Sequence, residues 1–99
     1  LDLSNTAVGN AGLRALVRAV PTLTDLDLEG TQIDDGGLRA LPSLPRLERL
    51  YLGNTGITDA GLAALADAPK LGSVDVTLCP GITEAGIAAL EAEGLAVDR

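Results

Sequence analysis

The stretch Leu26-Asp-Leu-Glu-Gly-Thr-Gln-Ile33 decides the fold, because it returns 24 residues later (50 − 26) as Leu50-Tyr-Leu-Gly-Asn-Thr-Gly-Ile57. A fixed period of roughly 20 to 50 residues is typical of proteins built from stacked repeats. Each unit of such a protein leaves an apolar face that only its neighbours can cover. The 99-residue chain is therefore predicted to form one continuous array.

Aligning this phrase divides the whole chain into units with no linker between them. The shared pattern is LxLxxT, an Ile or Val, a polar pair, a Gly followed by Leu or Ile, and a Leu three residues further on. The last unit adds a short C-terminal strand, because Gly94 ends a helix and Leu95 and Val97 then alternate with other residues. The predicted units are residues 1–25, 26–49, 50–73 and 74–99.

Within each unit the spacing of apolar residues changes from two to nearly four. Leu26 and Leu28 alternate with acidic residues, which predicts a short strand with one buried face. Leu38 and Leu41 have the spacing of the inner stripe of a helix. Each unit therefore reads as strand, turn, helix and return, and the last helix is expected from Ile87 to about Glu93.

The predicted helix starts carry polar residues that suit a helix N-terminus. An N-cap side chain accepts a hydrogen bond from the first free amides, and a following carboxylate complements the helix dipole. A Gly inside each helix is interpreted as a site of close backbone approach, because Gly there otherwise costs about 1 kcal/mol. The caps are Asp34, Thr58 and Thr83, the carboxylates are Asp35, Asp59 and Glu84, and the glycines are Gly12, Gly37, Gly61 and Gly86.

The segment Val74-Asp-Val-Thr-Leu-Cys-Pro-Gly-Ile-Thr-Glu-Ala-Gly-Ile87 resembles the phrase LxLxxCxxITDxGL of the cysteine-containing, ribonuclease-inhibitor-like leucine-rich repeat. Thr58-Asp-Ala-Gly-Leu62 repeats its second half, and the resemblance covers essentially the whole chain. It implies a right-handed α/β solenoid with a parallel sheet on the concave face and helices on the convex face. It also implies that Cys79 turns inward and bonds neighbouring turns, at the position that Thr6, Thr31 and Thr55 hold in the earlier units.

The composition argues against most catalytic chemistry. A reactive thiol needs a His or another cation beside it, and the chain has no His, so Cys79 is interpreted as structural. The carboxylates occupy positions predicted to be exposed, whereas an acid/base pair needs one of them buried. They also lack a DxDxDG-like loop for calcium. We therefore expect no enzyme activity, no cofactor and no metal.

The charge disfavours nucleic acid and anionic membranes as partners. Fourteen acidic residues stand against seven basic ones, for a net charge of −7. Binding to a phosphate backbone or an anionic membrane surface requires a concentrated positive surface. A protein partner is the remaining expectation, and the negative charge favours a basic one.

In this kind of repeat the residues beside the inward leucines face outward along the concave side of the sheet. Tyr51, the only aromatic residue, lies in the middle of the array, and interface hot spots favour Tyr and Arg near their centre. One reading is a set of solvated polar positions; the other is a binding face anchored by Tyr51 and Arg49. The candidate partner-binding residues are Tyr51, Arg49, Asp27, Asp25, Glu29, Asp75 and Asp2.

The function predicted first is a protein–protein interaction module with a concave, mainly acidic face. The alternatives are a recognition or autoinhibitory part of an enzyme whose catalytic domain lies N-terminal to it, and self-assembly through the first strand. Because Leu1 and Leu3 are already in phase with the repeat, a cap from preceding sequence or another chain is expected. The chain is accordingly interpreted as the C-terminal part of a longer bacterial protein, cytoplasmic or a secreted effector.

Overall fold

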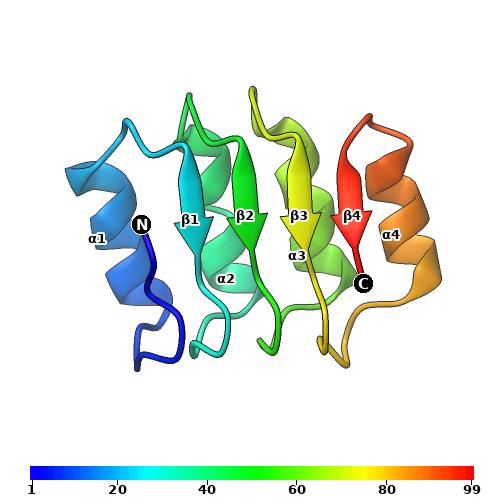
Figure 1. Ribbon diagram of the computed structural model, residues 1–99, viewed down its shortest axis with the longest axis horizontal. Helices are drawn as coiled ribbons and strands as arrows, with labels where there is room; N and C mark the ends of the chain where they lie inside the picture. The colour runs from blue at the N-terminus through cyan, green and yellow to red at the C-terminus, as the bar shows by residue number, and fades with distance from the viewer.

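The alternation of apolar with polar residues produces short strands at the start of the second, third and fourth units and at the C-terminus, and these strands pair side by side in parallel. The computed structural model describes residues 1–99. Its sheet has the strand order β1-β2-β3-β4, the order of the sequence, and is open at both edges (Figure 1). The strands are β1 (Asp25–Asp27), β2 (Arg49–Tyr51), β3 (Ser73–Asp75) and β4 (Ala96–Asp98).

The helices form a second layer behind the sheet (Figure 1). In the second and third units a short helix continues into a 3₁₀ turn, and in the second unit Pro42 lies in that turn. The elements of this layer are α1 (Asn10–Ala19), α2 (Asp35–Leu38), η1 (Leu41–Ser43), α3 (Asp59–Ala64), η2 (Leu65–Asp67) and α4 (Glu84–Glu91). The predicted order of strand, turn and helix is confirmed in the second, third and fourth units, and the molecule is an α/β repeat array. In the first unit the expected strand is reduced to an isolated parallel bridge at Asp2.

Strand pairing places equivalent residues of consecutive units beside one another. Leu26 pairs with Leu50, Leu50 with Val74, and Val74 with Val97. The segment at Leu1 to Leu3 continues this pattern on the other side, because Asp2 forms a parallel bridge with Asp27. The register of the repeat in the sequence is thus the register of the sheet.

The core lies between the two layers and is made of the repeated apolar positions. The two leucines of each LxL phrase in the second and third units are at most 1 % exposed. Leu13, Leu38 and Leu62 on the helices meet them from the other side, each 0 % exposed. Burial of a Leu side chain stabilises a fold by about 1.5–3 kcal/mol, so these ladders dominate the stability.

Two details of the predicted helices are corrected. The last helix begins at Glu84 rather than Ile87 and ends at Glu91 rather than near Glu93, because Thr83 already starts it. The chain then turns at Gly94, whose φ is +95°. That left-handed conformation favours Gly, so the predicted helix stop is confirmed.

The helix caps are confirmed for two of the three predicted residues. The Asp34 carboxylate accepts a hydrogen bond from the Gly36 amide at 3.0 Å, and the Thr83 hydroxyl accepts one from the Gly86 amide at 3.5 Å. Thr58 makes no such bond, so its prediction was wrong. Its hydroxyl is used in another way, because it donates to the Asp35 carboxylate of the preceding unit.

The residues that follow the caps bind the next unit. The Asp35 carboxylate accepts a hydrogen bond from the Thr58 amide at 2.7 Å, and the Asp59 carboxylate accepts one from the Thr83 amide at 2.8 Å. Asn10 holds the same position in the first unit, and its side-chain oxygen accepts from the Asp34 amide at 3.0 Å. We call these three contacts the helix-start ladder. Their carboxylates are structural, as predicted.

The ladder explains why three of the helix glycines lack a side chain. A Cβ at Gly61 would lie 2.2 Å from Asp35 Oδ1, one at Gly86 2.2 Å from Asp59 Oδ1, and one at Gly37 2.5 Å from Asn10 Oδ1. The predicted close approach is confirmed there. It is wrong for Gly12, where a Cβ would meet only Val8 Cγ1 at 3.7 Å, because no unit is packed against that side of α1.

Replacing Gly61 with Ala is expected to destabilise the array by about 2 kcal/mol, because the new Cβ displaces the Asp35 carboxylate. Gly12→Ala is the matched control, since it adds the same methyl group to a helix where there is space. It should stabilise the chain by up to about 1 kcal/mol through helix propensity. Urea unfolding measures both, and equal effects of the two substitutions would contradict the ladder.

Acid should weaken the ladder. Hydrogen bonds from the Thr83 hydroxyl and amide lower the pKa of Asp59 below its ordinary 3.8. A lowered carboxyl pKa in the folded state gives stability that is complete above 3.8 and is lost as the pH falls through the lower folded value. Thr83→Val removes the hydroxyl donor, so its urea midpoint should fall less between about pH 5 and about pH 2 than that of the wild type. Thr22→Val, an exposed control, should keep the wild-type pH dependence.

Candidate interaction face

The outward residues of the strands form the face of the sheet that the helices leave uncovered (Figure 1). Strand pairing sets Asp25, Arg49 and Ser73 side by side in one column. A second column runs through Asp2, Asp27, Tyr51, Asp75 and Asp98. We call this surface the sheet face; it corresponds to the concave face expected from the sequence.

Tyr51 occupies the middle of the second column. Its neighbours on the two adjoining strands are Asp27 and Asp75. Tyr51 is 39 % exposed to solvent. The structure therefore brings the predicted anchor together with two of its predicted carboxylates. An aromatic ring between carboxylates offers apolar contact area next to hydrogen-bond acceptors for a cation.

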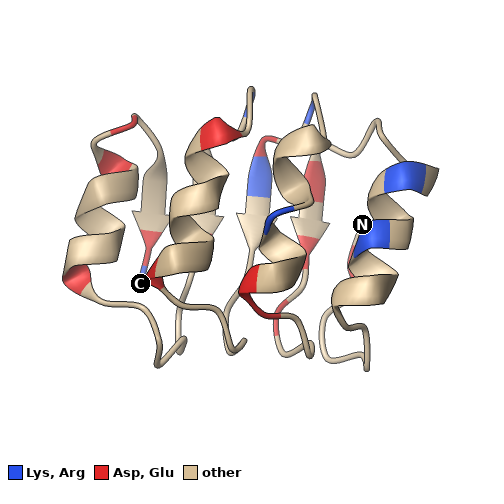
Figure 2. Ribbon diagram, turned by 180° about the vertical axis from the view of Figure 1, so that it is seen from behind, with Lys and Arg blue, Asp and Glu red and all other residues tan.

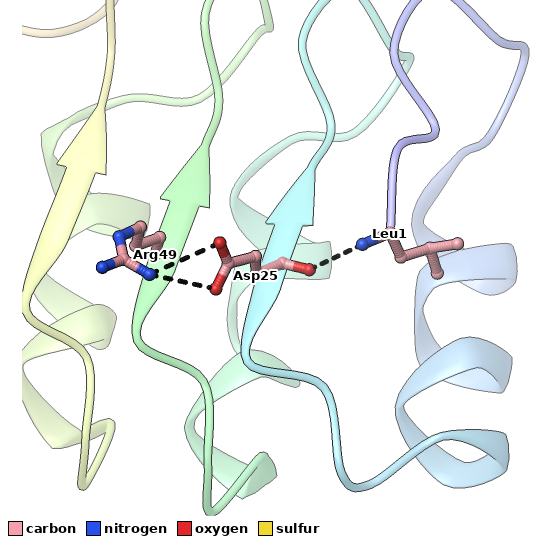
Figure 3. A network of polar contacts seen from close by, with 3 residues as sticks. All are labelled: Leu1, Asp25 and Arg49. Atoms are coloured by element: carbon pink, nitrogen blue, oxygen red, sulfur yellow. Dashed lines mark hydrogen bonds and ion pairs between the residues drawn. The ribbon is translucent and has the colours of Figure 1, made fainter.

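Arg49 is engaged by the neighbouring strand. Its guanidinium Nη1 lies 3.4 Å from Asp25 Oδ1 and 3.5 Å from Oδ2, and the nitrogen of Leu1 donates to the Asp25 carbonyl oxygen at 3.0 Å (Figure 3). The two charged side chains are 55 % and 46 % exposed. Exposed ion pairs contribute at most about 1 kcal/mol, so this pair can open at little cost.

Three carboxylates of the second column also bind their own backbone. Each accepts a hydrogen bond from the backbone amide two residues later. Asp2 accepts from the Ser4 amide at 2.9 Å, Asp27 from the Glu29 amide at 3.0 Å, and Asp75 from the Thr77 amide at 2.8 Å. The hydroxyl and amide of Ser4 lower the pKa of Asp2, which keeps it ionised. Sequence reasoning missed this local role, for which the signal was an Asp at one fixed place in three of the units.

Two further positions complete the description of the sheet face. Glu29 lies two residues after Asp27, and its side chain lies beside Gly53, two residues after the end of β2. Asp98 pairs with Asp75 and extends the second column to β4. Asp98 was not among the predicted site residues, although the predicted strand at Leu95 and Val97 already placed it there.

Cys79 turns inward, as the resemblance implied. It is 7 % exposed, its Sγ donates to the Leu52 carbonyl oxygen at 3.1 Å, and it lies 3.6 Å from Thr55 Oγ1. Thr55 itself donates to the same carbonyl oxygen at 2.7 Å, within its own turn. The thiol therefore links the last turn to the one before it.

No group of three or more His, Cys, Asp or Glu side chains is arranged to hold a metal ion. None of the helices has the length and hydropathy needed to cross a membrane. The acidic side chains of the sheet face are spread along a sheet instead of converging on one point, which suits an extended ligand better than a small ion.

Comparison with known proteins gives one result. The sequence profile described as "Leucine Rich repeat" matches residues 1–17, 21–41 and 44–66, which is more than half of the chain. No curated protein matches the chain. Each matched range contains the LxL phrase and the helix start of one of the first three repeats.

Cys79 should react slowly with a thiol reagent in the native state and rapidly in urea, because its sulfur is buried and hydrogen-bonded. The control is the double variant Cys79→Thr with Leu78→Cys, whose thiol occupies a 76 % exposed position and should react at once without denaturant. The absorbance of the product released by the reagent gives the labelling rate of the wild type and of the double variant. Fast native labelling of the wild type would contradict the inward placement.

Proposed function

Because the chain belongs to the leucine-rich repeat family, whose members generally mediate protein–protein interaction, we propose that its sheet face binds a basic protein partner. The observation that carries the proposal is the exposed Tyr51 between Asp27 and Asp75. A partner that places a Lys or Arg over this ring gains a cation–π contact and two carboxylate acceptors. Tyr51 is the anchor, and Arg49 opens from Asp25 to serve as its neighbour.

The charge of the sheet face supports a basic partner. The outward carboxylates of the two columns and of Glu29 outnumber the single guanidinium of Arg49. Complementary charge chiefly raises the rate of association and makes that rate depend on salt. The carboxylates are Asp2, Asp25, Asp27, Glu29, Asp75 and Asp98.

The module itself is proposed to have no catalytic role. Leucine-rich repeats are typically non-catalytic interaction modules, and Cys79 has only turn atoms as hydrogen-bond partners. If the array recognises substrate for an enzyme, it would use this same sheet face. The turn position of Cys79 favours the cysteine-containing, ribonuclease-inhibitor-like subtype, and the excess of carboxylates argues against nucleic acid as the partner.

The outer side of the first unit is proposed to be covered by a further repeat or by another chain. Leu1 is 52 % exposed there, and the Gly12 position keeps open the space that a helix-start side chain fills in the later units. Gly9, the residue equivalent to Asp34, Thr58 and Thr83, receives no ladder contact. These are the features that a preceding unit would use.

The test is selection of peptides from a random library displayed on phage, with the immobilised array as bait. The selected peptides should be enriched in Lys and Arg. Tyr51→Ala and Asp27→Lys should each weaken their binding about tenfold or more, with the Asp27→Lys effect mainly in the association rate. Surface plasmon resonance at two salt concentrations measures the dissociation constant and the association rate constant of each variant.

The control variants change the helix layer instead of the sheet. Arg39→Ala and Arg18→Ala alter exposed residues on or next to helices of the opposite layer and should leave peptide binding unchanged. If Tyr51→Ala and Asp27→Lys bind the selected peptides as well as the wild type does, the sheet face is not the binding site. Selection of acidic peptides would equally exclude a basic partner.

A further inference from the structure

A small polar pocket lies at the amino ends of β2 and β3, in the middle of the array. Its volume is about 210 Å³, below the range of about 300–1,000 Å³ typical of small-molecule sites, so it has room for one side-chain group. Both strands are paired on each side, so a further repeat at either end of the array would not fill it. We call it the amino-edge pocket; its lining, none of it hydrophobic, is Glu48, Arg49, Lys70, Gly72 and Ser73.

Gly72 leaves this pocket open without a structural need for glycine. It holds the place of Glu48 in the preceding unit, because its amide donates to the Glu48 carbonyl oxygen just as the Glu48 amide donates to that of Thr24. A Cβ at Gly72 would meet only the Glu48 carbonyl oxygen, at an ordinary 3.8 Å. Its φ is not left-handed either. Unlike Gly61, it is required neither by packing nor by the backbone.

Two cations line the amino-edge pocket. Lys70, the only lysine, is exposed and takes part in none of the ion pairs of the chain. Arg49 uses only Nη1 toward Asp25 (Figure 3), so its Nε and Nη2 form no hydrogen bond within the chain. Glu48 is the one carboxylate of the lining. One more carboxylate would balance the charge of the pocket, whereas a doubly charged phosphate would exceed it.

The sheet face is therefore not uniformly acidic. Figure 2 shows basic bands on β2 and in the loops that lead into β2 and β3. The basic residues of this region are Arg46, Lys70 and Arg49. Tyr51 and its neighbours Asp27 and Asp75 lie at the other end of the same strands.

The spacing along β2 connects the amino-edge pocket to the proposed anchor. Arg49 and Tyr51 are alternate residues of this strand, so they face the same way and their positions are about 6.6 Å apart. Alternate side chains of any extended segment have this same spacing. A partner segment that lies along β2 with Lys or Arg over Tyr51 therefore brings the residue two positions away to Arg49 and the pocket.

From these observations we propose that the amino-edge pocket binds an Asp or Glu carboxylate of the partner, two residues from the Lys or Arg that contacts Tyr51, in an extended segment. This inference rests on the proposed function, since it adds a second contact for the same partner. Lys70 and Arg49 pair with the carboxylate, and Ser73 adds a hydroxyl donor. The partner segment is thus of mixed charge, and the two contacts fix its register on the sheet.

Two variants test the pocket without unfolding the array. Gly72→Thr places in the pocket the residue that Thr24 holds in the first unit, and Lys70→Gln removes an exposed charge. Both should unfold at the urea concentration of the wild type or higher. The probe is a synthetic peptide selected from a random phage library on the wild-type array. We expect it to carry Asp or Glu two residues from Lys or Arg, and to bind each variant about tenfold more weakly in surface plasmon resonance.

Gly56→Gln is the matched control for Gly72→Thr. A Cβ at Gly56 would also meet only a carbonyl oxygen at 3.8 Å, that of Ile33, and Gln32 holds the equivalent place in the preceding unit. This variant adds a side chain outside the pocket, so it should bind the peptide as the wild type does. Equal weakening by Gly56→Gln and Gly72→Thr would show that the pocket is not the cause.

A charge exchange tests the direct pairing. A peptide whose Asp or Glu is replaced with Lys should bind the wild type poorly and should regain affinity for Lys70→Glu. Recovery in this combination requires that the two side chains meet. If Lys70→Glu binds the exchanged peptide no better than the wild type does, the carboxylate does not occupy the pocket.

Comparison with Tyr51→Ala separates the two proposals. If Tyr51→Ala loses binding while Lys70→Gln and Gly72→Thr bind normally, the sheet face binds a basic segment and the pocket is unused. If selected peptides carry Lys or Arg but no acidic residue at the stated spacing, the pocket proposal alone is wrong. If only Lys70→Gln and Gly72→Thr lose binding, the anchor at Tyr51 and the two-residue spacing are both wrong. Failure to select any peptide would overturn both proposals.

Discussion

The close approach of consecutive units at their helix starts is the constraint on which the rest of the array depends. Asn10, Asp35 and Asp59 each reach into the backbone of the next unit, and they fit only because that unit has a Gly at the point of contact. The contact fixes the spacing of the helix layer, while parallel strand pairing fixes the spacing of the sheet. Both layers repeat together, so the leucines between them meet in continuous ladders.

This arrangement separates scaffold from surface. The inward leucines and the ladder side chains are committed to contacts between units, whereas the residue between the two leucines points away from the core. That position varies from Asp to Tyr among the units without disturbing the core. Even there, Asp2, Asp27 and Asp75 use one carboxylate oxygen for a local backbone bond, so the negative charge of the sheet face has a structural origin as well as a proposed role in binding.

The sequence predicts most of the fold because the repeat reports its own register. The strands, the columns around Tyr51 and the close contacts of Gly37, Gly61 and Gly86 follow from aligning units, and the inward Cys79 follows from the resemblance to leucine-rich repeats. What it did not predict depends on three-dimensional contacts between different units. Thr58 lies at a cap position, but its hydroxyl bonds only the Asp35 carboxylate, whereas the Thr83 hydroxyl both donates to Asp59 and caps its own helix. The left-handed backbone of Leu78, with φ 61°, was not predicted either, because the equivalent residues of the earlier units are Asn5, Gly30 and Asn54, which tolerate that conformation, and Leu does not signal it.

Amide hydrogen exchange tests the central claim most directly. The amides of Thr58 and Thr83 lie outside the strands and helices, and each donates to a ladder carboxylate of the preceding unit. The equivalent amide of Gly9 has no such acceptor. If the helix-start ladder holds the units together, Thr58 and Thr83 exchange only when the array opens, while Gly9 exchanges at close to the rate of an unstructured peptide. Exchange of Thr58 and Thr83 as fast as that of Gly9 would contradict the account.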